Sequence, residues 1–429
     1  MTASLFEDFC NLLKDSLSYL TSGSPVAVAV SGGSDSMALC HLLKKWCDEY
    51  QFPLYALTVD HGLRAEAADE AILVGEWCAS LNIPHRVLKG AGEVPENGIQ
   101  AYARDLRYGL MEEACKDLGI SHLFLGHQQE DQIETFLMRF SRGSGLSGLV
   151  SMQSVGRRGE LYLHRPLLSV SRHRLRDYLF SVDQDWIEDP SNHDGRYTRT
   201  ALGPIRVNIA SLPGAEPGLL SLSLERMARA DQAIEAMVED CWARDVQVSP
   251  LGYAVISSEA FGSIAEEIRL RLMQQLIMTV SGGEFTARLS ELERIVADGG
   301  IVQAKTVGGC QILPRKAEIF ICREPGRKGP PREILTAGSE IHWDQRFLVR
   351  DLAPSPLPDE EFAIAAIRPE GFKEVGLDLP DQIAELPAVI RNGLPVVRIN
   401  EKIVAAPLIW PEIPGTGIAR DRFQMVFHS

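Results

Sequence analysis

The sequence predicts an α/β protein that begins with a doubly wound parallel sheet, followed by a helical domain and a small β-rich C-terminal domain. In the first part of the chain, short apolar runs of strand length alternate with stretches of helical periodicity, as in parallel-sheet proteins. Longer helical patterns begin near residue 217, and short alternating runs begin near residue 333. We therefore expect three domains, at 1–215, 216–330 and 331–429.

The first domain is expected to contain four buried strands, each followed by a helix. Apolar runs place these strands at 26–30, 53–59, 84–88 and 122–125. The helix after the last strand opens with Glu130 and Asp131. In open α/β sheets, ligands bind beyond the carboxyl ends of the strands, so the residues that follow each strand are the candidates for a site.

A locally basic segment, 139–176, follows these elements. It includes a glycine-rich stretch at 142–149, which is too flexible for a strand, and a helix that Ser171 is expected to cap. Arg172, Arg174 and Arg176 are expected on the outward face of that helix. They are candidates for contacts with a nucleic-acid backbone, and a solvated helix face explains them equally well.

The second and third domains show a different pattern. Helices are expected at 220–242 and 263–278, with a short strand at 253–257 between them. The segment 315–332 is rich in Arg, Lys, Pro and Gly and is interpreted as a basic linker. The runs beyond it predict the small β-rich domain.

Composition narrows the class of protein. The 429 residues carry a net charge of −15, with 45% hydrophobic residues and a mean hydropathy of −0.05, as in ordinary soluble proteins. No apolar run is long enough for a membrane span. The eight cysteines form no CxxC pair, which favours free thiols in a reducing cytoplasm. The charge argues against a protein that coats nucleic acid, although an enzyme with a local basic groove remains open.

The most informative stretch is a glycine turn that joins the first strand to its helix. Such a turn presents backbone N–H groups and a helix dipole to an anion, and glycine allows the positive φ that it needs. Two serine hydroxyls add hydrogen-bond donors. No Gly-Lys-Ser or Gly-Lys-Thr run occurs, so this is a phosphate loop of another kind. Its residues are Ser31, Gly32, Gly33, Ser34, Asp35 and Ser36.

An acidic residue beside a phosphate needs a cation or a nucleophile nearby, which makes Asp35 a candidate for catalysis. The alternative is that Asp35 only caps the helix that follows.

Taken together, seven motifs in order resemble the tRNA(Ile)-lysidine synthetase family of the PP-loop ATP pyrophosphatase superfamily. They span roughly residues 20 to 210, and the segment Asn392 to Val397 resembles the C-terminal module of the longer form of that family. The seven motifs are SGGSDS at 31–36, DHGLR at 60–64, RDLRY at 104–108, GHQQEDQIET at 126–135, RGSGLSGL at 142–149, RPLL at 165–168 and EDPSN at 188–192.

This resemblance implies a reaction and its substrates. ATP, with Mg²⁺, would adenylate the C2 carbonyl oxygen of the first anticodon cytidine of a tRNA(Ile) with a CAU anticodon. Free L-lysine would then displace AMP and give lysidine. The resemblance further implies a monomer or homodimer, and the lack of a long apolar run predicts no attachment to a membrane. Other PP-loop tRNA-modifying enzymes and a weakly active tRNA-binding homologue are the alternatives.

The resemblance also assigns roles. The whole turn, Ser31 to Ser36, would hold the ATP phosphates, and Arg107 would neutralise charge on the adenylate and pyrophosphate. Asp131 would orient the lysine ammonium or accept its proton, because only the neutral amine is nucleophilic. The alternatives are a surface pair for Arg107 and a helix-dipole role for Asp131. Glu134, three residues after Asp131, fits both roles equally well: binding the lysine ammonium, or interacting with the helix dipole.

Two positions depart from the family pattern. Family members usually have Asp where this chain has Glu130, which keeps the charge. Gly203 stands where an arginine is usual, and Arg206 is a nearby substitute. His61 and His127 each follow a strand, where a satisfied polar residue at the sheet edge is the commoner case. Arg64 is a candidate for contact with tRNA or phosphates.

Overall fold

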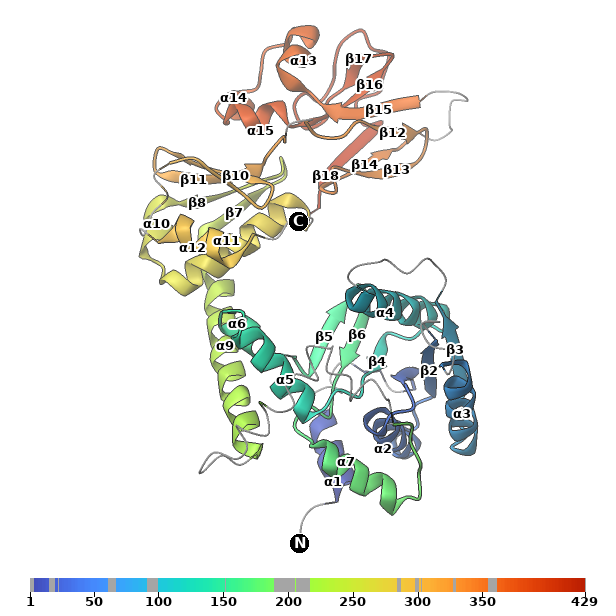
Figure 1. Cartoon of the computed structure of the whole chain (residues 1–429). Coiled ribbons are helices and arrows are strands. Elements are labelled where there is room, and N and C mark those ends of the chain that lie inside the picture. The colour runs from blue at the N-terminus through green and yellow to red at the C-terminus, as the bar shows by residue number, and fades with distance from the viewer. Residues whose placement is uncertain are drawn as a thin grey trace. The chain divides into compact units, whose positions relative to one another are not determined.

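Figure 1 shows the computed structural model of the whole chain, which divides into two compact units, 1–231 and 232–429. The division into three domains remains a prediction. None of the described helices is long and apolar enough to cross a membrane. The structure describes residues 4–14, 20–21, 23–60, 67–90, 99–150, 152–188, 205, 217–283, 287–297, 301, 303–326, 329–353 and 361–428.

Unit 1 is built on a six-stranded sheet in the order β3-β2-β1-β4-β6-β5. All neighbouring strands run parallel except β5 and β6, which are antiparallel. This confirms the parallel α/β sheet. The strands are β1 (Val26–Ala29), β2 (Leu54–Asp60), β3 (His85–Lys89), β4 (His122–Phe124), β5 (Val155–Arg158) and β6 (Leu161–His164).

The chain order creates a switch point between β1 and β4. From β1 the chain moves outward through β2 to β3, and then returns to add β4 on the other side of β1. Segments leaving β1 and β4 therefore diverge at the same edge of the sheet, which is where such folds bind ligands. The helices of this unit are α1 (Leu5–Lys14), α2 (Ser34–Tyr50), α3 (Ala67–Ser80), α4 (Ile99–Asp117), α5 (Gln129–Phe140), α6 (Leu146–Leu149), α7 (Arg172–Ser181) and the first part of α9 (Pro217–Asp245).

Alternation along β1 explains why helices cover both faces of the sheet. Val26 and Val28 pack in one core cluster, together with residues of α1, α2, α3 and α7. Ala27 packs in another core cluster, with residues of α4 such as Met111 and Cys115. Because successive side chains of a strand point to opposite faces, a run of apolar residues is buried on both sides.

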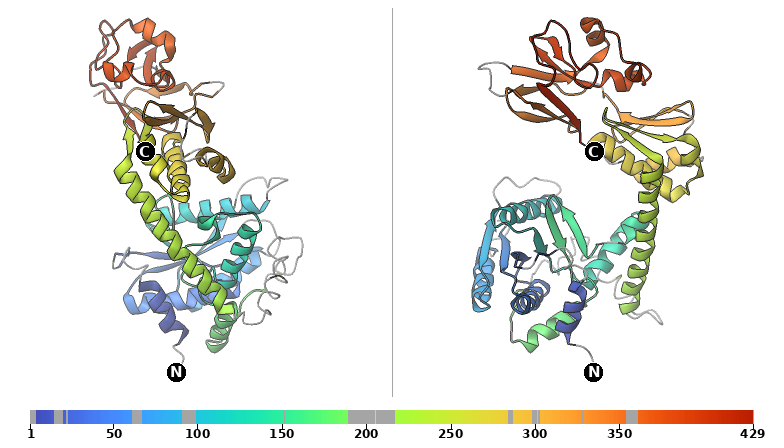
Figure 2. Two further views of the ribbon diagram at one scale, coloured as in Figure 1. Left: turned by 90° about the vertical axis from the view of Figure 1, so that its left-hand side faces the viewer. Right: turned by 180° about the vertical axis from the view of Figure 1, so that it is seen from behind.

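Unit 2 contains three further sheets (Figure 2). A five-stranded sheet comprises β7 (Val246–Ser249), β8 (Tyr253–Ser257), β9 (Lys305–Val307), β10 (Cys310–Arg315) and β11 (Glu318–Arg323). The remaining strands form a four-stranded and a three-stranded sheet and are β12 (Glu333–Thr336), β13 (Glu340–Trp343), β14 (Phe347–Asp351), β15 (Glu361–Ala366), β16 (Pro395–Ile399), β17 (Lys402–Ala405) and β18 (Phe423–Phe427). The helices are the rest of α9, α10 (Ser258–Ser263), α11 (Glu266–Ser281), α12 (Leu289–Val296), α13 (Arg368–Val375), α14 (Asp381–Ala384) and α15 (Ala388–Asn392).

The β-rich C-terminal part is confirmed, but the linker expected at 315–332 is wrong over β11. Ile319 and Ile321 lie in one core cluster, whereas Phe320 and Cys322 lie in another. A strand that is buried on both faces shows no alternation of polar and apolar residues. The basic residues on either side of β11 therefore made this segment resemble a linker. β10, which pairs with β11, was not predicted either.

Candidate active site

The glycine turn, residues 31–36, follows β1 directly and opens α2. Gly32 has a φ of +84°, the left-handed conformation that glycine adopts without strain. Gly33 is the N-cap of α2, and no side chain caps this helix. The capping role offered as an alternative for Asp35 is therefore wrong, because Asp35 lies inside the first turn of α2.

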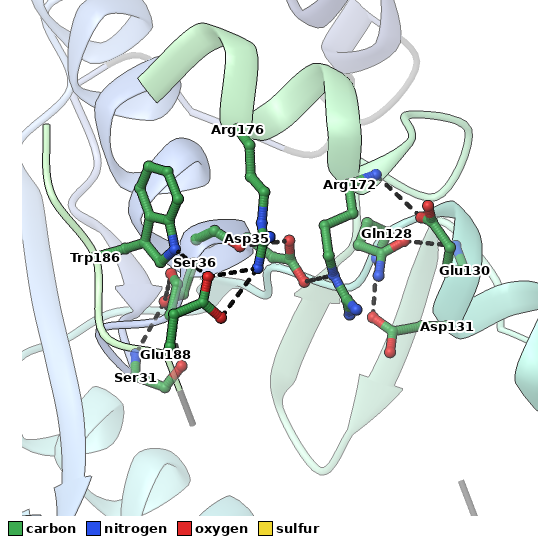
Figure 3. Close-up of polar contacts among 12 residues, drawn as sticks. Ser31, Asp35, Ser36, Gln128, Glu130, Asp131, Arg172, Arg176, Trp186 and Glu188 are labelled. Atoms are coloured by element: carbon green, nitrogen blue, oxygen red, sulfur yellow. Dashed lines mark hydrogen bonds and ion pairs between the residues drawn. The ribbon is translucent and has the colours of Figure 1, made fainter. Parts of the chain in front are cut away.

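The hydroxyl of Ser36 stabilises the turn from inside. It donates to the carbonyl of Gly33 at 2.9 Å and accepts from the backbone N–H of Ser31 at 3.2 Å. Ser34 and Ser36 are both buried. Ser36 thus fixes the shape of the turn, as Figure 3 shows for its contact with Ser31.

Two glycines leave little room for a Cβ in the packing around the turn. A Cβ on Gly32 would lie 2.6 Å from the Cδ1 of Ile187, whose N–H donates to the Gly32 carbonyl at 2.9 Å. A Cβ on Gly126, just after β4, would lie 3.0 Å from the Cα of Ser36. The segments after β1 and β4 therefore meet at the switch point.

The second side of the site is the start of α5. Gln128 is fully buried, and its side chain accepts from the N–H of Glu130. Asp131 accepts from the N–H of Gln128 at 3.1 Å, which completes a capping box. Asp131 therefore does stabilise the N-terminus of α5. Its half-buried carboxylate also faces Asp35 and Arg172 (Figure 3).

Arg172, the first residue of α7, connects the two sides. Its Nε donates to Asp35 Oδ2 at 3.2 Å, and its backbone N–H donates to Glu130 Oε2 at 3.0 Å. The outward orientation expected for Arg172 is wrong. The first turn of α7 lies against the site, because Gln129 N–H also donates to the carbonyl of Val170 at 3.0 Å, just before that helix.

The electrostatics of Asp35 reflect this crowding. Burial raises the pKa of Asp35, the guanidinium of Arg172 opposes the rise, and the nearby carboxylate of Asp131 adds to it. Two carboxylates and one guanidinium thus share the space beyond β1 and β4. Such a site favours a cationic ligand over a neutral one.

Two neighbours of Arg172 on the same helix also pair with acids. Arg174 contacts Asp8 of α1, and Arg176 contacts Glu188 at 2.9 Å. The guanidinium of Arg176 lies 5.6 Å from the ring of Trp186, beside the glycine turn (Figure 3). Both arginines therefore form ion pairs within unit 1.

Arg107 lies on α4, where it is exposed and belongs to an arginine cluster around Tyr108. The guanidinium groups of Arg104, Arg107 and Arg158 lie 5.1, 5.5 and 5.4 Å from the Tyr108 ring centre. Arg158 also pairs with Glu112 of α4 at 3.2 Å, so part of this positive charge is compensated within the cluster. The assignment of Arg107 to catalysis remains a prediction.

Sequence reasoning missed Arg172, Glu130 and Gln128 as parts of the site. The signal that could have identified Arg172 is its position directly after the Ser171 cap. The side chain of a residue in the first turn points back toward the N-terminus of its helix. His61, Arg64, Gly203 and Arg206 lie outside the described residues, as does most of the EDPSN motif.

The fold and the glycine turn define a class of protein. Residues 3–210 match the family model described as a PP-loop domain, ATP_bind_3. The PP-loop interpretation of the turn is therefore confirmed, and with it the use of ATP that characterises this class.

Comparison with curated proteins gives the family. A tRNA(Ile)-lysidine synthase of Rhodopseudomonas palustris is 40% identical over 72% of this chain and 92% of its own length. The Wolbachia sp. relative of the same name, from Brugia malayi, is 33% identical over 91% of this chain and 90% of its own. The Ruegeria pomeroyi protein is 34% identical, with 76% of each chain covered. The chain belongs to the tRNA(Ile)-lysidine synthase family.

Proposed function

We propose that this protein ligates free L-lysine to C2 of the first anticodon cytidine of a CAU-anticodon tRNA(Ile), with consumption of ATP. The proposal rests on family membership together with one observation in particular. Asp35, from the PP-loop, and Asp131, from the start of α5, face the same space at the switch point of the sheet. Because the proposed reaction joins lysine to C2, the enzyme would be a ligase that forms a carbon–nitrogen bond. We further propose that it acts in the cytoplasm.

The first step is adenylation. The C2 oxygen of the cytidine attacks the α-phosphorus of ATP, and pyrophosphate leaves. The backbone N–H groups of the PP-loop and the start of α2 bind the phosphates, and Arg107 neutralises the charge on the leaving group. A Mg²⁺ ion bound with ATP would neutralise phosphate charge. The serine hydroxyls and the Asp35 carboxylate are hard oxygen donors, which fit this ion.

The second step is attack by the amine. The neutral ε-amine of lysine forms a bond to C2, and the former C2 oxygen leaves with AMP. Asp131 binds the lysine ammonium first and then accepts its proton, for which the half-buried carboxylate beside Asp35 is suitably placed. The resulting lysidine pairs with adenosine, so that the tRNA reads AUA.

An incorporation assay tests this function. Purified protein is mixed with ATP, Mg²⁺, radiolabelled lysine and an unmodified CAU-anticodon tRNA(Ile) transcript. We expect alkali-stable label in the tRNA and an equal amount of AMP. A transcript with uridine at the first anticodon position is the control and should stay unlabelled. No label on the CAU transcript, while ATP and tRNA still bind, would contradict the proposal and favour another amine or a weakly active tRNA-binding homologue.

A further inference from the structure

Arg172 holds two separate parts of the site with two different groups. Its side chain reaches Asp35 in the PP-loop, at 3.2 Å, and its backbone N–H reaches Glu130 in the first turn of α5, at 3.0 Å (Figure 3). One residue of α7 therefore ties together the segments that follow β1 and β4.

The backbone contact follows from the position of Arg172 at the start of a helix. The first N–H groups of a helix have no partner within it. The hydroxyl of Ser171 accepts from Arg174, at 3.4 Å, and the carboxylate of Glu130 accepts from Arg172. A negative charge at this end of α7 is also favoured by the helix dipole.

The side-chain contact follows from the charges around Asp35. Arg172 faces it from α7, the Asp131 carboxylate faces it from α5, and the Ser34 hydroxyl donates to it from α2 at 3.3 Å. The side chain of Asp35 is only 19% exposed and that of Arg172 is 35% exposed. Without the guanidinium, the carboxylates of Asp35 and Asp131 would face each other as like charges. Solvent would screen this repulsion less than it screens charges at the protein surface.

We propose that Arg172 is a positioning residue for adenylation, which holds the PP-loop and the start of α5 in the geometry that the reaction needs. It acts through Asp35 and Glu130 and does not itself touch the substrates. This inference rests on the proposed function only for its kinetic readout, because the positioning itself can be measured without any reaction.

Three variants separate charge from shape in the kinetic readout. R172A removes both, R172Q keeps a donor without the charge, and R172K keeps the charge. In tRNA-dependent AMP formation, we expect R172A to lower kcat about 10- to 100-fold, because small misplacements of reacting groups cost that much. The KM for ATP should change by less than about 3-fold. R172K should recover more of kcat than R172Q.

The control is H173A. His173 is the next residue on α7, its side chain is 86% exposed, and it pairs with Asp177 on its own helix. We expect wild-type kcat and KM for H173A. Equal kcat for R172A and H173A would overturn the inference, as would equal recovery by R172Q and R172K. If R172A does not fold, the comparison of R172Q with R172K decides the question alone.

Hydrogen exchange supplies the readout that needs no catalysis. In R172A, and not in H173A, the peptide that contains residues 31–37 should exchange faster than in the wild type, because Asp35 loses its contact with the guanidinium. The peptide that contains residues 126–133 should change less, because the backbone N–H of residue 172 still donates to Glu130. Unchanged exchange in the 31–37 peptide would contradict the inference even if the lysine assay fails. Faster exchange, with no lysine incorporated by the wild type, would keep the inference and refute the proposed function.

Discussion

Two Asp–Arg pairs in this molecule look alike but have opposite surroundings. In unit 1, Asp35 and Arg172 join two segments at the edge of the sheet, with side chains 19% and 35% exposed. In unit 2, Asp344 and Arg346 form a pair at 2.8 Å whose side chains are 6% and 4% exposed.

The two pairs also differ in their charge balance. Asp344 contacts a second cation, Arg323, at 3.3 Å, and Arg346 donates to the carbonyl of Gly252 at 3.4 Å. The unit 1 pair instead has an additional carboxylate, Asp131, beside it. The buried group in unit 2 therefore has two guanidinium groups to one carboxylate, whereas the group in unit 1 has two carboxylates to one guanidinium. This difference teaches that the sign of the charge around an ion pair, and its place beyond the strand ends, distinguish the candidate site better than the ion pair itself.

The largest expected effect is on the acidic side of the unit 1 site. D131N removes the proton acceptor and should lower lysine incorporation about 10²- to 10⁴-fold, the usual range for a general base. Steady-state labelling of tRNA measures it. D177N, which changes an exposed aspartate on α7, is the control and should keep full activity. Activity of D131N within about 2-fold of the wild type would remove Asp131 from the mechanism.

Breaking the unit 2 pair should affect stability and not catalysis. D344A leaves Arg346 buried without its carboxylate, which should cost about 3–5 kcal/mol in the free energy of unfolding. Urea denaturation followed by fluorescence measures this. E340A removes an exposed partner of Arg350 and should cost under about 1 kcal/mol. If the two variants cost the same, the buried pair does not differ from a surface pair.

Acid should destabilise unit 1 through a buried histidine pair. His122 Nδ1 and His164 Nε2 lie 2.9 Å apart between β4 and β6. Burial, with smaller contributions from His122 and Arg165, lowers the pKa of His164 from 6.5 to about 4. The folded state thus favours the neutral form. Its contribution is complete above pH 6.5, declines as the pH falls and is lost near pH 4, for a total of about 3 kcal/mol.

Denaturation across this pH range checks the prediction. H164F, which can still stack on Phe124 as His164 does at 4.7 Å between ring centres, should flatten the slope between pH 6.5 and 4. H173A changes an exposed histidine and should keep the slope. A wild-type stability that does not change over this range would show that His164 is not held neutral.

The smallest effect concerns the PP-loop backbone. G32A and G119A both place a Cβ at positive φ, +84° and +66°, which costs about 1 kcal/mol. Gly119 has open space at its Cβ, whereas Gly32 meets Ile187. We expect G32A to cost up to about 1 kcal/mol more in thermal unfolding, since the flexible end of Ile187 can partly yield. Equal costs would mean that the contact with Ile187 is not close.

Much of unit 1 could be predicted from the sequence, because each of its first strands is a clear apolar run followed by a polar turn. The strand expected at 53–59, for example, is β2 over Leu54–Asp60. β5 and β6 were missed, because Val155 to Arg158 is short and polar and pairs only with β6. Their existence depends on tertiary pairing, which local patterns do not encode.

The site was predicted only as far as local motifs reach. Asp35 and Asp131 stand in recognisable motifs, and their convergence follows from the parallel sheet. The position of Arg172 depends on how α7 packs beside α2 and α5, and its neighbours Arg174 and Arg176 share the same local pattern without reaching Asp35. No periodicity distinguishes the three, so only the fold could show which one faces the site.

The most direct test of the central claim is to trap the adenylated tRNA. Protein, Mg²⁺, ATP labelled at the α-phosphate and CAU-anticodon tRNA(Ile) are mixed without lysine, and the tRNA is then isolated. We predict that label remains on the tRNA and that added lysine releases it as AMP. A tRNA that never carries the label, while the same mixture with lysine still forms lysidine, would contradict the two-step mechanism at the Asp35 and Asp131 site.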